Sequence, residues 1–328
     1  MSFHIADPAR LGGGRLDPRL KLLYRLSPAS RTQELSPVEE RMREKKKMRT
    51  LNRFLVHRDR VAQIGDLLIP GEDRSIPVRI YKPGSHSSSP ILIYLHGGGW
   101  VLGGVNQSDP VCRRLAKQGE CIVVSVDYRL APESKFPAAL EDTLIVLDWV
   151  YRNGDKIGGD PSRIGMAGGS AGGTLATAAS LCTLRQGYPL ITFQILINPV
   201  TNLVKMDTVS HQKFGEGDFG ITTHLLRRRR EQYLEAEDQR YDPRVSPLLA
   251  DDLSGSPPAL ILTAEFDPLR DEAEEYAAML EEGGVETLCV RYMGATHGFF
   301  NFVGFLPQAD AALGEAAHFI QHTSTSLL

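Results

Sequence analysis

The sequence predicts an α/β fold with a mostly parallel central sheet flanked by helices. Short apolar runs of the strand type recur along the chain, and segments of helical spacing lie between them. Two of these runs end in glycine-rich turns, and one turn has the pattern Gly-x-Ser-x-Gly. Such a turn is typical of a strand that passes into a helix lying close against the sheet. The chain of 328 residues is long enough for one large core or two modest domains.

The N-terminal part, from about residue 17 to residue 57, is predicted to form amphipathic helices. Asp17-Pro18 is expected to open one helix. Ser36-Pro37-Val38-Glu39 is expected to open another, because serine then proline, with glutamate at the third helical position, is a good helix start. Strands are predicted to begin near Val61 and Pro77.

A strand-like run at 91–95 ends in the loop His96-Gly97-Gly98-Gly99-Trp100. Acyl transfer needs donors aimed at the oxygen that becomes negative in the tetrahedral intermediate. Backbone N–H groups of glycines serve this purpose because no side chain blocks the approach. Gly97 and Gly98 are therefore candidate oxyanion donors, and a merely flexible glycine loop is the alternative.

The segment 164–173 carries the strongest chemical signal in the chain. A short apolar run leads into Gly168-Gly169-Ser170-Ala171-Gly172, and small residues that can start a helix follow. This pattern indicates a nucleophile elbow, a strained turn that exposes the serine hydroxyl. The N–H of Ala171 supplies a further candidate oxyanion donor. Upstream, apolar residues at helical spacing predict a long helix over 138–152.

The alternation of strands and helices is interrupted after the strand at 193–197, because the segment 202–241 has helical and loop character without a strand. Long insertions in compact domains are usually functional or disordered, so a cap over the site is favoured over a plain surface insertion. The basic run at 227–230 is interpreted as a solvated helix face, since acidic residues follow closely. The candidates for an apolar pocket in this segment are Phe214, Phe219, Leu225, Leu226 and Tyr233.

A further strand-like run at 258–264 is followed by three carboxylates within a few residues. An acid just past a strand end is well placed for catalysis, and Asp267 is the chosen candidate. Glu265 and Asp271 are its competitors. Asp271 is expected near the start of the following helix, where an acid has a stabilising role of its own.

The strand at 286–292 leads into His297, the candidate general base. Only this histidine follows both a strand and a preceding acid in the required order. It would take the proton of Ser170, while Asp267 would hold the imidazole in one tautomer. Most of the other histidines are interpreted as solvated or locally hydrogen-bonded: His4, His57, His86, His96, His211, His224, His318 and His322.

Together these motifs resemble the hormone-sensitive lipase family of α/β-hydrolases, the bacterial esterase group called family IV. The likeness covers nearly the whole chain, from about residue 16 to about residue 298. The matching segments are the oxyanion loop at 96–100, a stretch typical of the family at 126–133 and 136–139, the elbow at 168–173, the acid segment at 267–271 and the base segment at 297–299.

The resemblance implies the α/β-hydrolase fold with a helical cap. It implies a carboxylesterase that hydrolyses esters of short to medium acyl chains through an acyl-enzyme intermediate. A deacetylase, amidase or lactonase would use the same triad. Receptors of this fold have lost the histidine, so His297 argues against that role. The implied divisions are an N-terminal helical cap segment at 1–57, the core at 58–201, a cap insertion at 202–245 and the C-terminal part of the core at 246–328.

One residue departs from the family pattern. The family usually has aspartate or another polar residue just before the nucleophile, and this chain has Gly169. Because this position is not a member of the triad, activity is expected to survive the change. The departure puts in doubt the local hydrogen bond of that residue and the rigidity of the elbow.

The composition limits the classes of binding partner that we expect for this protein. The formal net charge of −3 gives no sign of a nucleic-acid surface. No stretch of about 18 or more apolar residues exists, and the N-terminus lacks the apolar core of a secretion signal. No stable membrane insertion and a cytoplasmic location are therefore expected. The expected partner is a small-molecule ester, and neither a metal nor an organic cofactor is needed. A homodimer is left open, with an edge strand near 286–292 as its expected contact.

Overall fold

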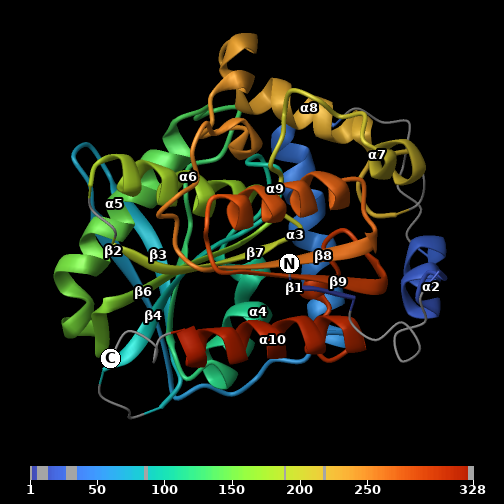
Figure 1. Ribbon diagram of the computed structural model, residues 1–328. Coiled ribbons are helices and arrows are strands. Elements are labelled where there is room, and N and C mark those ends of the chain that lie inside the picture. The colour runs from blue at the N-terminus through green and yellow to red at the C-terminus, as the bar shows by residue number, and fades with distance from the viewer. Residues whose placement is uncertain are drawn as a thin grey trace.

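A nine-stranded sheet forms the centre of the molecule in the residues that the structure describes (Figure 1). The structure is a computed structural model, and it describes residues 2–5, 14–26, 35–84, 88–187, 190–216 and 219–323. The strand order is β1-β9-β8-β7-β6-β4-β5-β3-β2. The strands are β1 (Ser2–Ile5), β2 (Gln63–Pro70), β3 (Ser75–Lys82), β4 (Ser89–Leu95), β5 (Ile122–Val126), β6 (Gly159–Gly169), β7 (Ile191–Ile197), β8 (Ala259–Phe266) and β9 (Thr287–Thr296).

Most of the sheet is parallel, which confirms the predicted fold class. From β1 across to β5 every neighbouring pair runs parallel, and only β3 is antiparallel to its neighbours β5 and β2. Parallel neighbours need crossover connections, which are usually helices. The helices are α2 (Pro18–Leu26), α3 (Pro37–Phe54), α4 (Val105–Gln118), α5 (Ala138–Asn153), α6 (Ala171–Arg185), α7 (Val209–Phe214), α8 (Thr223–Tyr233), α9 (Arg270–Glu282) and α10 (Pro307–Thr323). Short 3-10 turns lie at Gly154–Ile157, Glu237–Tyr241, Pro247–Leu249 and Phe299–Asn301.

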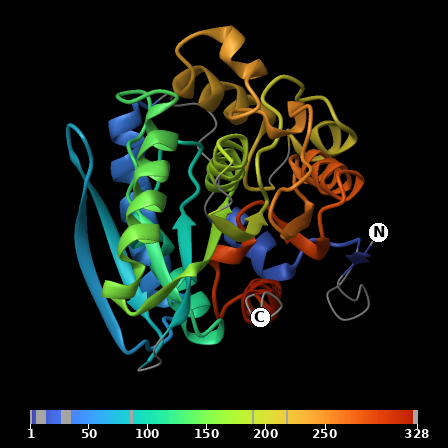
Figure 2. The ribbon, with the colours of Figure 1, turned by 60° about the vertical axis from the view of Figure 1, so that its left-hand side comes forward.

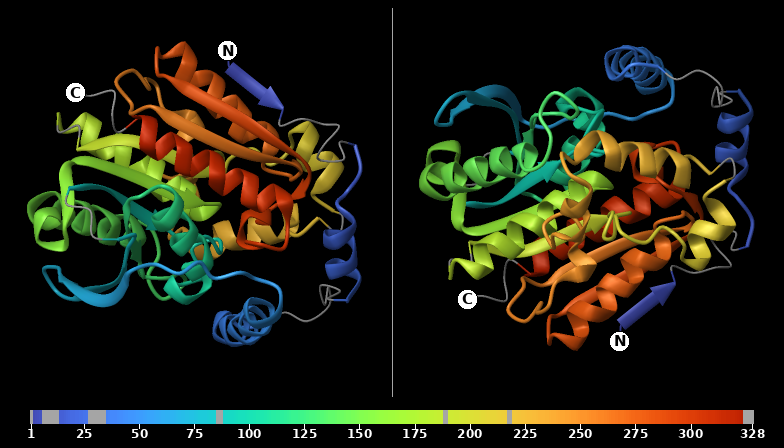
Figure 3. Two further views of the ribbon diagram at one scale, coloured as in Figure 1. Left: turned by 90° about the horizontal axis from the view of Figure 1, so that it is seen from below. Right: turned by 90° about the horizontal axis from the view of Figure 1, so that it is seen from above.

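Helices cover both faces of the sheet (Figures 1 and 3). α4 and α10 pack together on one face, and α5, α6 and α9 pack on the other. Successive residues of β4 point to opposite faces of the sheet. Ile91, Ile93 and Leu95 belong to the buried cluster on one face, and Leu92 and Tyr94 belong to the cluster on the other. A strand buried on both sides is a continuous apolar run, which is why the sequence predicted it. No helix in the described ranges is both long and apolar enough to cross a bilayer.

The two predicted N-terminal helix starts are confirmed. α2 begins at Pro18 and α3 at Pro37. Before α3, the Ser36 hydroxyl donates to the Glu39 carboxylate at 2.7 Å, and the Glu39 N–H donates back to Ser36 Oγ at 3.3 Å. The Glu39 carboxylate also accepts the Ser36 N–H at 2.9 Å, so this bond and the one from the Glu39 N–H satisfy two backbone donors at the helix start.

The extreme N-terminus departs from the helical prediction. Residues 2–5 form β1, the arrow beside the N mark in Figure 3. β1 pairs in parallel with β9, and Ser2 lies opposite Leu288. The expectation that the strand near 286–292 lies at an edge is therefore wrong, because β9 lies between β8 and β1. A strand of four residues is too short to show a periodic pattern, so sequence reasoning could not detect it.

The strand order brings the two glycine-rich turns together. β4 and β6 are neighbours although β5 lies between them in sequence, so the order reverses at this point. Leu95 lies opposite Gly168, and the loop after β4 therefore begins beside the turn after β6. Ligands of open α/β sheets bind at such a reversal, outside the carboxyl ends of the strands.

Helices from two distant parts of the chain lie together beyond this edge of the sheet. α7 and α8 follow β7, and Figure 2 shows α8 across the top of the view. In the described residues of 202–241 no strand occurs, as predicted. α3 from the N-terminal part is joined to α8 by an ion pair between Glu40 and Arg229 at 2.7 Å.

Candidate active site

Ser170 stands on a tight turn between β6 and α6. Its φ of 54° and ψ of −121° are strained for a residue with a side chain. Two glycines make this turn possible. A Cβ on Gly168 would lie 2.2 Å from the Gly172 backbone, and a Cβ on Gly172 would lie 2.0 Å from the Leu95 carbonyl oxygen. The turn therefore has the close strand-to-helix approach of a nucleophile elbow.

The side chains of Ser170, His297 and Asp267 form a hydrogen-bonded chain. Ser170 Oγ lies 3.0 Å from His297 Nε2, and His297 Nδ1 lies 2.9 Å from Asp267 Oδ2. Asp267 is fully buried, whereas Ser170 and His297 keep a small exposed fraction. Asp267 Oδ1 accepts a second hydrogen bond, from the Leu269 N–H at 2.9 Å. The structure thus brings together the three residues that the sequence singled out.

The register between β8 and β9 explains how the acid and the base meet. The register shifts just before the two strands end, so that Phe266 lies opposite Thr296. The next residue on each strand is Asp267 or His297. The acid and the base therefore each follow directly after one of two paired residues. This pairing fixes their separation more firmly than two unpaired loops would.

The two competing carboxylates have other partners. Glu265 Oε2 accepts the N–H of Gly294 at 2.7 Å, at the place where β9 bulges out of register with β8. Asp271 Oδ2 accepts the N–H of Ser210 at 2.7 Å and so ties α9 to α7. Both acids position the backbone around the site, and neither is bonded to His297.

The glycine loop after β4 lies against the elbow. A Cβ on Gly97 would lie 2.9 Å from the Gly169 carbonyl oxygen and 3.4 Å from Ser170 Cβ. The N–H groups of Gly97, Gly98 and Ala171 are not among the donors of the hydrogen bonds found in the described part of the chain. Gly97 is thus the loop glycine that directly contacts Ser170.

Phe300 fills the space beside Gly169, the residue that departs from the family pattern. A Cβ at this position would lie 2.3 Å from Cζ of the Phe300 ring, and that ring is almost fully buried. The polar side chain usual in the family has no room in this packing. An aromatic ring supports the elbow from that side instead.

Among the remaining histidines whose side chains the structure describes, His96 and His211 are buried, and both have local partners. His86 lies outside the described residues. His96 Nδ1 donates to the Gly97 carbonyl oxygen at 2.9 Å, and its ring stacks on Tyr128 with centroids 4.1 Å apart. Burial lowers the pKa of His96, which favours the neutral ring. His211 Nδ1 lies 2.8 Å from Thr208 Oγ1. Local hydrogen bonding, as predicted, accounts for both residues.

A buried pair near Asp267 escaped sequence analysis. Glu272 Oε2 and His211 Nε2 lie 3.8 Å apart, and both side chains are almost fully buried. Burial raises the pKa of Glu272 to about 8, although N–H groups of Thr201 and Asn202 donate to its other oxygen and oppose the rise. An acid in the first turn of a helix is usually exposed, so the sequence carried no signal for this one.

Glu272→Gln is expected to flatten the pH dependence of stability. Since the pKa in the folded protein, about 8, lies above the ordinary value of 4.5, the folded state keeps a proton that the unfolded chain releases. Stability contributed by this proton is complete below about pH 4.5 and is lost as pH rises towards about 8, by up to about 1.4 kcal/mol per pH unit. Glutamine keeps the acceptor for the two N–H groups without titrating.

Urea unfolding of both proteins between pH 5 and 9, buffer by buffer, measures this effect. We expect the free energy of unfolding of the glutamine variant to rise relative to that of the wild type as the pH rises. Parallel curves across that range would show that Glu272 titrates near its ordinary value.

The prediction that the arginine run at 227–230 is a solvated face is wrong. Arg227 alone of the four is exposed. Arg228 and Arg229 bind the two oxygens of Glu40, at 3.0 Å and 2.7 Å. The carboxylate comes from α3, far away in the sequence, so no local pattern around the run could reveal it.

Four of the five pocket candidates in the 202–245 segment fall into two groups, and the fifth, Leu225, is half-buried. Phe214 and Phe219 pack with Phe266, which directly precedes the acid, at ring separations of 5.4 to 5.5 Å. Leu226 and Tyr233 are buried and serve packing. The first group is therefore the better candidate for lining a pocket beside the triad.

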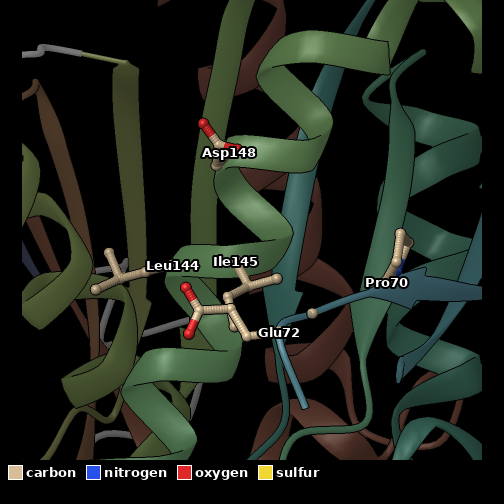
Figure 4. A pocket seen from close by; sticks show the side chains of 6 residues that line it. Pro70, Glu72, Leu144, Ile145 and Asp148 are labelled. Carbon is tan, nitrogen blue, oxygen red and sulfur yellow. The ribbon is translucent and has the colours of Figure 1, made fainter. Parts of the chain in front are cut away.

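A separate hollow of about 460 Å³ lies between the β2–β3 turn and α5 (Figure 4). It shares no residue with the triad or with the glycine loop, so it has no part in the chemistry of Ser170. Its lining residues are Pro70, Gly71, Glu72, Leu144, Ile145 and Asp148.

Known proteins resemble this chain over most of its length. The family model of the alpha/beta hydrolase fold matches residues 92–301. A carboxylic ester hydrolase of Mycobacterium tuberculosis, LipN, is 38% identical over 300 residues, which cover 89% of this chain and 78% of the relative. An arylesterase of Saccharolobus solfataricus is 39% identical over 74% of this chain and 79% of its own length.

Solved structures give the same result. An esterase from Pyrobaculum calidifontis superposes with a TM-score of 0.89 at 38% identity, covering 94% of this chain and 99% of its own. The likeness therefore extends over the sheet, the flanking helices and the helices beyond the strand ends. The chain belongs to the hormone-sensitive-lipase-type carboxylesterases of the α/β-hydrolase fold.

Proposed function

We propose that this protein hydrolyses carboxylic esters of short to medium acyl chains, with Ser170 as nucleophile, His297 as general base and Asp267 as its orienting acid. The observation that carries the proposal is the hydrogen-bonded chain, 3.0 Å from Ser170 Oγ to His297 Nε2 and 2.9 Å from Nδ1 to Asp267 Oδ2. A serine hydroxyl is a weak nucleophile by itself, and a base within hydrogen-bond reach activates it.

In the first half of the reaction, Ser170 Oγ forms a bond to the ester carbonyl carbon while its proton passes to His297 Nε2. The carbonyl oxygen becomes an oxyanion. When the tetrahedral intermediate collapses, the bond to the alcohol oxygen breaks and the alcohol leaves with the proton from His297. In the second half, His297 takes a proton from water while the water oxygen forms a bond to the acyl carbon. The bond from that carbon to Ser170 Oγ then breaks, His297 returns its proton to Oγ, and the carboxylic acid leaves.

The N–H groups of Gly97, Gly98 and Ala171 are the proposed donors to the oxyanion. Two belong to the loop after β4, and the third belongs to the first residue of α6, which directly follows Ser170. Hydrogen-bond donors that are already in position stabilise the oxyanion far more strongly in a partly buried site than donors in water do. Removing one such donor typically lowers kcat by about 100- to 1,000-fold.

The fully buried Asp267 has a defined task in this scheme. Its Oδ2 accepts the Nδ1–H of His297, which leaves Nε2 free to accept the serine proton. The negative charge also stabilises the imidazolium that forms during attack. No step of this chemistry calls for a metal or an organic cofactor.

The segments 1–57 and 202–245 are proposed to act together as a cap, leaving 58–201 and 246–328 as the hydrolase core. The described residues of β1 are excepted, because they belong to the sheet. Gly220 lies beside the triad, since a Cβ on it would be 3.3 Å from the His297 carbonyl oxygen. A cap this close limits the room for the acyl chain and keeps bulk water from the intermediate.

Hydrolysis of p-nitrophenyl esters, from acetate to long acyl chains, tests the proposal. The wild type is expected to be fastest at short to medium chains, and Ser170→Ala to lose about 10,000-fold in kcat or more. A fluorophosphonate probe should add its mass to the peptide containing Ser170 and to no other. Equal turnover by the wild type and Ser170→Ala would refute the nucleophile, and a maximum at long chains would refute the chain-length assignment.

A further inference from the structure

We propose that Arg229 of α8 and Arg41 of α3 are positioning residues that hold the glycine loop after β4 in the conformation needed to bind the oxyanion. This inference rests on the function proposed above, because it assigns the loop its role in that reaction. It gives the two helices beyond the strand ends a part in the rate of the chemical step, besides covering the site.

The loop has a strained backbone, although the N–H groups of Val101 and Leu102 donate to the Gly98 carbonyl oxygen within it. Gly98, Gly99 and Trp100 have φ values of 123°, 61° and 60°, three successive residues in the left-handed region. Tryptophan has a Cβ and is strained there. Such conformations persist only when the surrounding structure enforces them. Side chains of α8 and α3 contribute contacts that enforce this one.

Arg229 lies directly on Gly99. A Cβ on Gly99 would meet Cγ, Cδ and Cβ of Arg229 at 2.7, 3.0 and 3.2 Å, so the aliphatic stem of the arginine covers the glycine backbone. The arginine is 5% exposed. Its guanidinium donates to Glu40 Oε2 at 2.7 Å and to Gln232 Oε1 at 2.8 Å, which fixes the stem in place. Burial lowers the pKa of Arg229, and the Glu40 carboxylate opposes that effect.

Arg41 holds the far end of the loop. Its Nε donates to the Val101 carbonyl oxygen at 2.7 Å, and its Nη2 donates to the Ala131 carbonyl oxygen at 2.6 Å. Both oxygens of Glu133 bind the same guanidinium, at 2.8 and 2.6 Å. The Ala131 N–H in turn donates to the Trp100 carbonyl oxygen at 2.9 Å. A planar guanidinium held by a carboxylate in two places is a rigid anchor for backbone carbonyls.

Between the two arginines, Tyr233 of α8 stacks on Trp100. The ring centroids are 4.3 Å apart and the planes differ by 7°. Tyr233 follows Arg229 by one turn of the same helix, so the two side chains cover consecutive loop residues. Glu40 and Arg41 are sequence neighbours on α3, and this helix therefore secures the loop both through α8 and directly.

Three variants test the proposal against p-nitrophenyl butyrate and a trifluoromethyl ketone, which adds to the serine and carries the oxyanion of the intermediate. Arg229→Ala removes both stem and charge. Arg229→Met keeps an apolar stem without charge. Arg227→Ala is the matched control, an exposed arginine on the same helix. Melting temperatures and titration of Ser170 with a fluorophosphonate establish that each variant is folded and intact.

We expect Arg229→Ala to lower kcat by about 10- to 100-fold, a displaced donor costing less than a deleted one, while KM changes by no more than about 2-fold. Affinity for the trifluoromethyl ketone should fall in parallel with kcat/KM. Arg229→Met should fall between the wild type and the alanine variant, and Arg227→Ala should match the wild type.

Two results would overturn the inference. One is a rise in KM at unchanged kcat, because that would make Arg229 part of the substrate pocket. The other is an unchanged ketone affinity in a folded Arg229→Ala. If Arg229→Ala does not fold, Arg41→Lys provides the test. Lysine keeps the positive charge but lacks the planar guanidinium that binds the two backbone carbonyls and Glu133. An undiminished kcat in this variant would contradict the proposal. A wild type that neither turns over esters nor reacts with the fluorophosphonate would instead defeat the proposed function itself.

Discussion

Asp267→Asn is expected to lower kcat for ester hydrolysis by about 10,000-fold while the protein remains folded. The reason lies in the second hydrogen bond of this side chain. Oδ1 accepts the Leu269 N–H at 2.9 Å, and Oδ2 accepts from His297 Nδ1. In asparagine the oxygen must face Leu269, so the amide nitrogen faces the imidazole and donates to Nδ1. The ring then carries its proton on Nε2 and cannot accept one from Ser170.

Steady-state kinetics on a short p-nitrophenyl ester, with circular dichroism as the check on folding, measure this effect. Asp271→Asn is the matched control, since it makes the same change four residues away on an acid that anchors Ser210 and does not contact the imidazole. The control should stay within a few-fold of the wild type. A folded Asp267→Asn that keeps a tenth or more of the wild-type kcat would remove this residue from the triad.

Gly172→Ala is expected to lower the free energy of unfolding by about 3 kcal/mol or more and to abolish most activity. The added methyl group would lie 2.0 Å from the Leu95 carbonyl oxygen and 2.7 Å from that of His96. Both atoms belong to backbone next to the glycine loop, so no side-chain rotation relieves the clash. α6 must move away from β4, and Ser170 at its start moves with it.

Gly314→Ala in α10 provides the contrasting control for urea unfolding. Nothing outside the helix lies within 4 Å of a Cβ placed on Gly314. The same substitution there should stabilise the protein by about 0.5 to 1 kcal/mol, because alanine loses less backbone entropy than glycine on folding. If both variants shifted stability in the same direction, the packing argument for Gly172 would be wrong.

The sequence was sufficient wherever the constraint is local. Apolar runs predicted β4, β7, β8 and β9 because these strands are covered by helices on both faces. The nucleophile elbow could be predicted from the sequence because its tight turn leaves room only for glycine at positions 168 and 172. The order of strand, acid, strand and base then singled out Asp267 and His297. Pairing of Phe266 with Thr296 explains why that inference placed them together.

The sequence failed where a residue takes its environment from a distant segment. Arg229 appeared to be one cation in an exposed run, and only the approach of α3 with Glu40 makes it a buried support. Glu265 looked like a rival for the triad, and only the β9 bulge gives it another task. Gly169 looked like a defect in the elbow until the ring of Phe300 was seen to fill the space.

The pairing of β1 with β9 has a consequence for how the chain reaches this structure. β1 leaves the ribosome far ahead of its partner, and that partner must itself dock on β8 before the edge of the sheet is complete. Contacts between such distant segments form slowly, because a long loop must be closed before any of them is gained. The nascent β1 segment therefore has no partner in the sheet until β9, the last strand in the sequence, has been made.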